Sequence, residues 1–268
     1  MTDPARRQRI LRQRLRTEAL MGIEAVPLAA PPQRAEAVEP VEPAPAPTSA
    51  RDARPERAGE RRSGSPATPE PASRQEKIDR LETINQQEAQ TCQACGLCAG
   101  RSSVVFGEGD PDASLMFIGE GPGQREDELG RPFVGRAGEL LTKMIKAMGF
   151  ERDQVYITNI VKCRPPNNRA PTPEEVATCW PFLKRQIEII RPRVIVTLGG
   201  PATKTILETR DGITRLRGRW HTFPGVDPPI PVMPTFHPAF LLRQYTQENR
   251  GRVWADLQQV MELLGEKK

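Results

Sequence analysis

Aromatic residues and histidines are scarce in this chain, and long apolar runs are absent. Its 268 residues include three tryptophans, two tyrosines, eight phenylalanines and two histidines, and the first aromatic residue is Phe106. No apolar run approaches the roughly 18 residues that a membrane-spanning helix needs. The N-terminus contains arginines but lacks the apolar core of a secretory signal. We therefore expect a cytoplasmic protein without a membrane partner.

The N-terminal part of the chain also lacks the composition from which a core could form. Twelve of the 28 prolines precede residue 75, and residues 29–73 are rich in Pro, Ala, Arg and Glu without periodicity. Such a segment cannot bury enough apolar area to offset its conformational entropy. We predict a disordered extension over residues 1–75 and one folded domain over residues 76–268, a size that suffices for one well-buried core.

A basic segment at the start of the chain leaves three interpretations open. Apolar residues recur among arginines at roughly helical spacing in residues 5–28. The segment fits a solvated basic tail, an amphipathic helix that docks on DNA or a protein partner, or a mitochondrial transit peptide, which Glu18 and Glu24 disfavour. The net charge of +5 and the sequence pI of about 9.1 are compatible with a nucleic-acid partner.

Beyond residue 76, short apolar runs alternate with helical patterns. We expect a short strand at 103–106, four core strands at 115–118, 155–158, 194–198 and 231–236, and helices at 75–90, 138–148, 173–190, 201–207, 238–243 and 251–264. Strands that alternate with helices indicate an α/β fold, with a parallel sheet covered by helices on both faces.

Glycines or polar residues follow each of the four core strands. They are Gly119-Glu120-Gly121, Asn159, Gly199-Gly200 and His237-Pro238. The carboxyl ends of parallel strands meet at one edge of a sheet, where open α/β folds bind their ligands. The glycine-rich turn matches neither the dinucleotide fingerprint nor the P-loop. The sequence predicts a ligand site at this edge, with turn capping by Asn159 and helix capping by His237 as alternatives.

Five cysteines favour metal or redox chemistry over disulfides in a protein without signs of export. Cys92 and Cys95 form a C-x-x-C pair, as do Cys95 and Cys98, while Cys163 follows a strand and Cys179 lies on a long helix. Four thiolates suit either Zn²⁺ or a [4Fe–4S] cluster, and spacing does not choose between them. A set of unrelated buried thiols is the alternative.

Five motifs of this sequence occur together in a known family. They are GEGPG at 119–123, GRPFVG at 130–135, TNIVKCRPP at 158–166, NRAP at 168–171 and HPAFLL at 237–242. In this order, from about Cys92 to Leu264, the chain resembles the family 4 uracil-DNA glycosylases, which are the iron–sulfur type. Nothing from the resemblance carries over to residues 1–75.

The resemblance implies a three-layer α/β/α sandwich around a short, mainly parallel four-stranded sheet. It also implies a [4Fe–4S] cluster that acts as a structural clasp. Its ligands would be Cys92, Cys95, Cys163 and Cys179, and Cys98 does not match a general ligand position of the family.

The resemblance further implies roles for residues at the sheet edge. Phe133 would stack on a flipped uracil, Asn159 would hydrogen-bond its edge, and His237 would donate to a uracil oxygen as negative charge develops there. The turn Gly119-Glu120-Gly121 would line the base pocket. Glu120 and Asn168 match positions implicated in placing or activating water, and both count among the catalytic candidates with His237.

Two leucines are candidates for a DNA wedge, and two positions differ from related glycosylase families. Leu241 or Leu242 is the candidate wedge for the gap that a flipped base leaves, with ordinary helix packing as the alternative. Gly121 stands where the classical family has a catalytic aspartate. Residues 163–171 contain no histidine, which disfavours the covalent trapping of the uracil-crosslinking relatives.

We therefore expect a monomeric uracil-DNA glycosylase that acts on single- or double-stranded DNA in the bacterial nucleoid and starts base-excision repair. The alternative is a metal-stapled nucleic-acid-binding module without catalysis.

Overall fold

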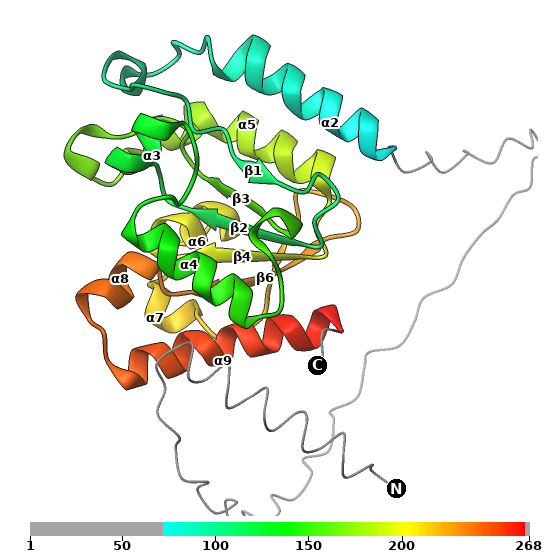
Figure 1. The fold of residues 1–268 in the computed structure, drawn as a ribbon, viewed down its shortest axis with the longest axis vertical. Helices are drawn as coiled ribbons and strands as arrows, with labels where there is room; N and C mark the ends of the chain where they lie inside the picture. The colour runs from blue at the N-terminus through cyan, green and yellow to red at the C-terminus, as the bar shows by residue number, and fades with distance from the viewer. Residues whose placement is uncertain (1–71, 266–268) are drawn as a thin grey trace, which may run out of the picture. The chain divides into compact units, whose positions relative to one another are not determined.

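The computed structural model describes residues 72–265, and our predictions for residues 1–71 lie outside this range. A six-stranded sheet forms its centre (Figure 1), with the strand order β1-β3-β2-β4-β6-β5. The four inner strands pair in parallel and are β2 (Leu115–Gly119), β3 (Tyr156–Asn159), β4 (Val194–Leu198) and β6 (Ile230–Thr235). The four predicted core strands are confirmed.

Two short antiparallel strands widen the sheet beyond the four strands expected. They are β1 (Glu108–Gly109) beside β3 and β5 (His221–Phe223) beside β6. Because they contain only two and three residues, neither has a recognisable apolar period. Residues 103–106, expected as a strand, form no strand, and the first strand lies just beyond them.

Helices cover both faces of the sheet (Figure 1). The helices are α2 (Arg74–Thr83), which continues into a π-helical turn (Ile84–Ala89), α3 (Gln124–Leu129), α4 (Arg136–Ala147), α5 (Pro173–Ile190), α6 (Gly200–Leu207), α7 (Ile213–Leu216), α8 (Pro238–Arg243) and α9 (Gln247–Leu264). Short 3₁₀ turns occur at Gly96–Ala99, Arg152–Gln154 and Pro166–Asn168. No helix within residues 72–265 is long and apolar enough to cross a membrane.

Alternate side chains of the strands divide the core into two apolar clusters. Met116 and Ile118 on β2 belong to the cluster that includes residues of α2, α5 and α6. Leu115 and Phe117, their neighbours on the same strand, belong to the cluster that includes residues of α4, α8 and α9. All four are fully buried, and burying such a side chain stabilises a fold by about 1.5–3 kcal/mol. The three-layer α/β/α arrangement is confirmed.

Helix α5 carries Cys179, a candidate metal ligand, and its bounds are set by the local sequence. Thr172 accepts a hydrogen bond from the Glu175 amide at 3.3 Å, and the Glu175 carboxylate accepts one from the Thr172 amide at 2.8 Å. Pro173 occupies the first turn, where its missing N–H costs nothing. Arg169 adds a bidentate ion pair to Glu175. The helix therefore has its predicted bounds and holds Cys179 at a fixed position.

Candidate active site and thiol cluster

Gly119, at the end of β2, lies against two buried side chains, those of Asn159 and Phe133. We call this group of residues, together with His237, the pocket. A Cβ at this position would lie 2.4 Å from Asn159 Oδ1 and 2.5 Å from Phe133 Cζ. Only glycine therefore allows these two side chains to approach the strand. The register of the sheet pairs Gly119 with Asn159, the last residue of β3. The predicted meeting of strand ends at one edge is confirmed here.

The side chain of Asn159 has an unused hydrogen-bonding atom. Asn159 is 1% exposed, and its Oδ1 accepts no hydrogen bond from any residue within 72–265. A buried polar atom without a partner costs about 1–3 kcal/mol. Such an atom beside the ring of Phe133 is suited to a planar polar ligand that lies against the ring and supplies a donor.

Phe133 is held in a left-handed backbone conformation that non-glycine residues rarely adopt. Its φ is 50°. The Glu126 carboxylate accepts hydrogen bonds from the amides of Val134 at 2.9 Å and Gly135 at 2.8 Å, and so fixes the chain directly after the ring. Our sequence prediction missed Glu126, because an acidic residue in the first turn of a helix is an ordinary feature.

His237 caps helix α8 and belongs to the pocket at the same time. Its Nδ1 accepts a hydrogen bond from the Ala239 amide at 3.1 Å. The proton of the neutral ring is therefore on Nε2, which is left as a donor. The ring centroid lies 5.6 Å from that of Phe133. At Gly199, where φ is 88°, a Cβ would lie 3.0 Å from His237 Cβ.

The surroundings of His237 favour the neutral ring. Burial, together with the positive charge of Arg243, lowers the pKa of His237 to about 4, and Glu126 partly opposes this change. The ring is thus uncharged at neutral pH. Capping and ligand contact, which were alternatives in the sequence, use different nitrogens and are compatible.

The two candidates for handling water lie in different environments. Glu120, which directly follows Gly119, is partly buried, and burial raises the pKa of its carboxyl, against the effect of Arg243. Asn168 is exposed, and its Oδ1 accepts a hydrogen bond from Arg164 Nε at 2.8 Å. A Cβ on Gly121 would lie 2.9 Å from Val161 Cγ2, so a longer side chain at this position would require a shift.

The two candidate wedge leucines have opposite surroundings. Leu241 is fully buried in the cluster that contains α4 and α9, where it packs as an ordinary core residue. Leu242 is 43% exposed. Of the two, Leu242 is the one at the surface, and Leu241 is corrected to a packing residue, which is the alternative that the sequence left open.

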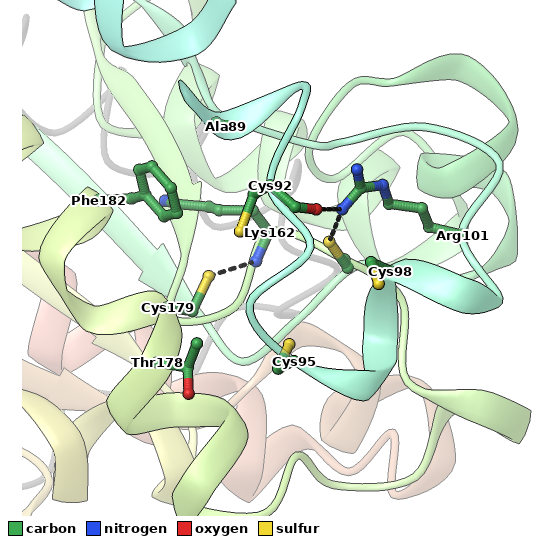
Figure 2. Close-up of a pocket in the computed structure, with 10 residues that line it drawn as sticks. Ala89, Cys92, Cys95, Cys98, Arg101, Lys162, Thr178, Cys179 and Phe182 are labelled. Carbon is green, nitrogen blue, oxygen red and sulfur yellow. Dashed lines mark hydrogen bonds between the residues drawn. The ribbon is translucent and has the colours of Figure 1, made fainter. Parts of the chain in front are cut away.

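A second constellation lies beside β3 and α5, where all five thiols surround one hollow. Figure 2 shows Cys92, Cys95, Cys98 and Cys179 around it, together with Arg101 and Lys162. Cys163 completes its set of thiols. The four predicted ligands, which are distant in sequence, are thus brought together.

Two N–H groups point at the sulfurs of this hollow. Arg101 Nη1 donates to Cys163 Sγ at 3.3 Å, and the backbone N–H of Lys162 donates to Cys179 Sγ at the same distance (Figure 2). Burial raises the pKa of the Cys163 thiol, against the effect of Arg101, and raises that of Cys179 to about 11. Thiolates at these positions would require a positive partner.

The donor set fits a metal centre held by thiolates. Five cysteines line one hollow, and N–H groups donate to two of their sulfurs. Zn²⁺ and a [4Fe–4S] cluster both accept four thiolate ligands, and these cysteines are the residues that would hold either group.

Lys162 lies between the pocket and the thiols, and the sequence prediction did not single it out. Its side chain is buried, and burial lowers its pKa to about 7. Lys162 Nζ donates to the Asn159 carbonyl at 3.0 Å, to Thr158 Oγ1 at 2.5 Å and to Gln186 Oε1 at 2.6 Å. One residue thus bonds the strand end that carries Asn159 and, through its backbone, a thiol of the hollow.

The comparisons with known proteins agree with this geometry. A family model for the uracil DNA glycosylase superfamily matches residues 106–258. The type-4 uracil-DNA glycosylase of Thermotoga maritima is 51% identical over 159 residues, which are 59% of this chain and 81% of the relative. That of Sulfurisphaera tokodaii is 50% identical over 168 residues, 61% of this chain and 76% of the relative. A type-5 uracil-DNA glycosylase of Thermus thermophilus is 31% identical over 166 residues, 54% of this chain and 72% of the relative.

The chain therefore belongs to the uracil-DNA glycosylase superfamily. The matched region contains the four parallel strands and the residues Gly119, Phe133, Asn159 and His237. Within the superfamily, identities of 50% and 51% to the two type-4 relatives, against 31% to the type-5 relative, place it in the type-4 family. The family expected from the motifs is confirmed.

Proposed function

We infer that this chain is a DNA repair enzyme that hydrolyses the N-glycosidic bond of uracil in DNA and so starts base excision. The observation that carries this inference is the pocket at Gly119, where the Phe133 ring, the unpaired Asn159 Oδ1 and the neutral His237 ring meet. These groups match a flat pyrimidine: a face for stacking, an acceptor for the uracil N3–H, and a donor for a uracil oxygen.

We propose the following roles in the reaction. The uracil leaves as an anion, and the Nε2–H of His237 donates to the oxygen on which this charge develops, which stabilises the transition state. The Asn159 amide distinguishes uracil from cytosine because the edges of the two bases exchange acceptor for donor. Glu120, whose raised pKa reflects burial, is the candidate for orienting water at the sugar, with Asn168 as a further candidate.

We also propose that Cys92, Cys95, Cys163 and Cys179 hold a [4Fe–4S] cluster. When bound, the cluster supplies a covalent clasp between three segments of the chain, which are the C-x-x-C turn, the segment after β3 and helix α5. Leu242 is the proposed DNA wedge. We expect the protein to act as a monomer in the cytoplasm on DNA of the bacterial nucleoid.

Release of free uracil tests the proposed activity directly. The purified protein is incubated with an oligonucleotide that contains one uracil, in single-stranded and in duplex form, and the released base and the abasic product are measured. An enzyme yields both in equal amounts. DNA binding without either product would support the alternative, a metal-stapled binding module without catalysis.

Asn159→Asp tests how the base is recognised. The carboxylate accepts at both oxygens, so the hydrogen bond that the amide N–H₂ donates to uracil is lost, and we expect uracil excision to slow by about 10²-fold or more. Excision of cytosine relative to uracil should rise. Single-turnover rates on U·G and C·G duplexes measure both changes. If the variant instead unfolds, Asn159 acts as a structural cap of β3 and the proposed recognition is wrong.

Removal of residues 1–71 tests whether the N-terminal extension is dispensable. The predicted boundary lies between residues 75 and 76, but α2 begins at Arg74, so the variant must start a few residues earlier. A protein that begins at Ala72 keeps Ser73, which caps α2 through the Glu76 amide, and the contacts of Arg74 with Asp110 and Asp112. We expect it to fold and to excise uracil from a short oligonucleotide at the full-length rate. A deficit confined to long DNA at low salt would indicate phosphate contacts by the arginines. Loss of activity on the short substrate would place the extension in the site.

A further inference from the structure

The connection between α8 and α9 carries an unusual pair of exposed apolar side chains. Leu242 is 43% exposed and Tyr245 is 56% exposed, and they are two of the five large hydrophobic residues exposed within 72–265. Every residue from 242 to 248 is exposed. We call residues 242–245 the projection. It begins five residues after His237, on the helix that this histidine caps.

The projection is exposed but its backbone is braced. The Gln244 carbonyl accepts hydrogen bonds from the Thr246 amide at 2.9 Å and from Asn249 Nδ2 at 3.2 Å. Thr246 Oγ1 in turn accepts from the Asn249 amide at 3.1 Å and caps α9. The residues on both sides of Tyr245 are thereby fixed. A contact made by this ring would cost little additional ordering of the chain.

Two arginines lie at the projection, one within it and one against its tyrosine ring. The Arg250 guanidinium carbon lies 4.5 Å from the centroid of the Tyr245 ring, a cation–π arrangement that orients the ring. Arg243 lies on the projection itself, and its charge lowers the pKa of both His237 and Glu120, so it acts on the pocket. An apolar ring and an exposed leucine with arginines beside them are complementary to bases within a phosphate backbone.

We propose that Tyr245 stacks on the face of a nucleobase that becomes exposed when the uracil is flipped out. This role rests on the proposed uracil excision and extends it beyond the base pocket. Flipping leaves two unstacked surfaces, on the base opposite the gap and on the neighbouring base of the same strand. Aromatic rings bind either surface with little dependence on sequence. Leu242 fills the gap, and Tyr245, three residues further along the projection, covers the adjoining base.

Binding and kinetics of Tyr245→Ala and Tyr245→Phe test the proposal. Affinity is measured with oligonucleotides that contain 2′-fluoro-2′-deoxyuridine, which resists hydrolysis, and kcat and KM are measured with ordinary uracil substrates. We expect Tyr245→Ala to weaken binding about tenfold, with the loss in KM rather than in kcat. Tyr245→Phe keeps the ring and should match the wild type. Leu263→Ala, which shortens an exposed apolar residue near the end of α9, is the matched control and should change nothing.

Single-stranded and duplex substrates separate the two sources of the base. A loss confined to duplex DNA identifies the opposite base, and an equal loss on both forms identifies the neighbour in the same strand. 2-Aminopurine placed at the identified position should fluoresce more with Tyr245→Ala than with the wild type, because the stacked ring quenches it.

Three results would overturn the role of Tyr245. They are wild-type binding by Tyr245→Ala, a loss by Tyr245→Phe equal to that of Tyr245→Ala, and an equal loss by the Leu263→Ala control. A wild-type protein that releases no uracil would instead refute the proposed function, so the two failures are distinguishable.

Discussion

His237→Ala should slow the chemical step of uracil excision by about 10²–10³-fold while DNA affinity stays nearly unchanged. Removing one donor aimed at a developing anion has an effect of this size in other enzymes. The structure leaves Nε2 as the donor because Nδ1 is already used by the Ala239 amide. Single-turnover rates on a U·G duplex, with binding measured separately, give the two quantities. Excision at the wild-type rate would show that the pocket has been assigned wrongly.

His237→Asn is the matched control, because an asparagine side chain can still cap α8. If loss of the cap alone reduced the rate, Asn at this position would restore it, whereas loss of the Nε2 donor predicts that it does not. The pH dependence of unfolding adds an independent measurement. The pKa of His237 is about 4 in the folded protein against 6.5 ordinarily. Between these pH values the His237 ring therefore binds a proton only in the unfolded chain. Stability should therefore fall as pH drops from 6.5 towards 4, and His237→Ala should weaken this dependence.

Cys163→Ser should lose bound iron and much of the thermal stability together. We expect the wild-type protein to be yellow-brown, with broad absorption near roughly 400 nm from a thiolate-bound iron–sulfur centre. Serine is a poor ligand, so iron content should fall from about four atoms per chain towards zero. Since metal binding is coupled to folding, the melting temperature should drop by about 10 °C or more. Iron assay, absorption and calorimetry check these outcomes.

Cys98→Ser is the control for the loss of a thiol from the same hollow. Cys98 lines the hollow but is not among the four proposed ligands, so this variant should keep its iron, its colour and its melting temperature. The opposite pattern, with iron lost in Cys98→Ser and kept in Cys163→Ser, would assign the ligands differently. Colourless wild-type protein with one zinc per chain would contradict the cluster itself.

The elements with a strong period could be predicted from the sequence, and the short ones could not. Helix α5 has its expected bounds because Thr172 and Pro173 mark its start and apolar residues recur along it. Strand β4 is a continuous buried run, Val194–Leu198, as expected. Strands β1 and β5 lie at the edges, where pairing with one neighbour determines the structure and no local pattern marks it.

The candidate site could be located from the sequence, but its supporting residues could not. Asn159 and His237 were found because both follow strands whose ends meet at one edge. Glu126 and Lys162 act through contacts with segments brought close only by folding, so a chain read in order gives no sign of them. The sequence could not decide whether Leu241 or Leu242 is the candidate wedge, because it does not show which side of α8 faces the core.

The short link from Asn159 to Cys163 has a consequence for how this chain can change during evolution. The Asn159 carbonyl bonds the Lys162 side chain, and the Lys162 amide bonds the Cys179 sulfur. An added or deleted residue in this link would move the Cys163 thiol relative to the side-chain amide of Asn159. Substitutions can accumulate one at a time, but a change of length here would have to repair two sites at once. We therefore expect lineages that descend from this protein to keep the length of this link, and to vary in length in surface loops instead.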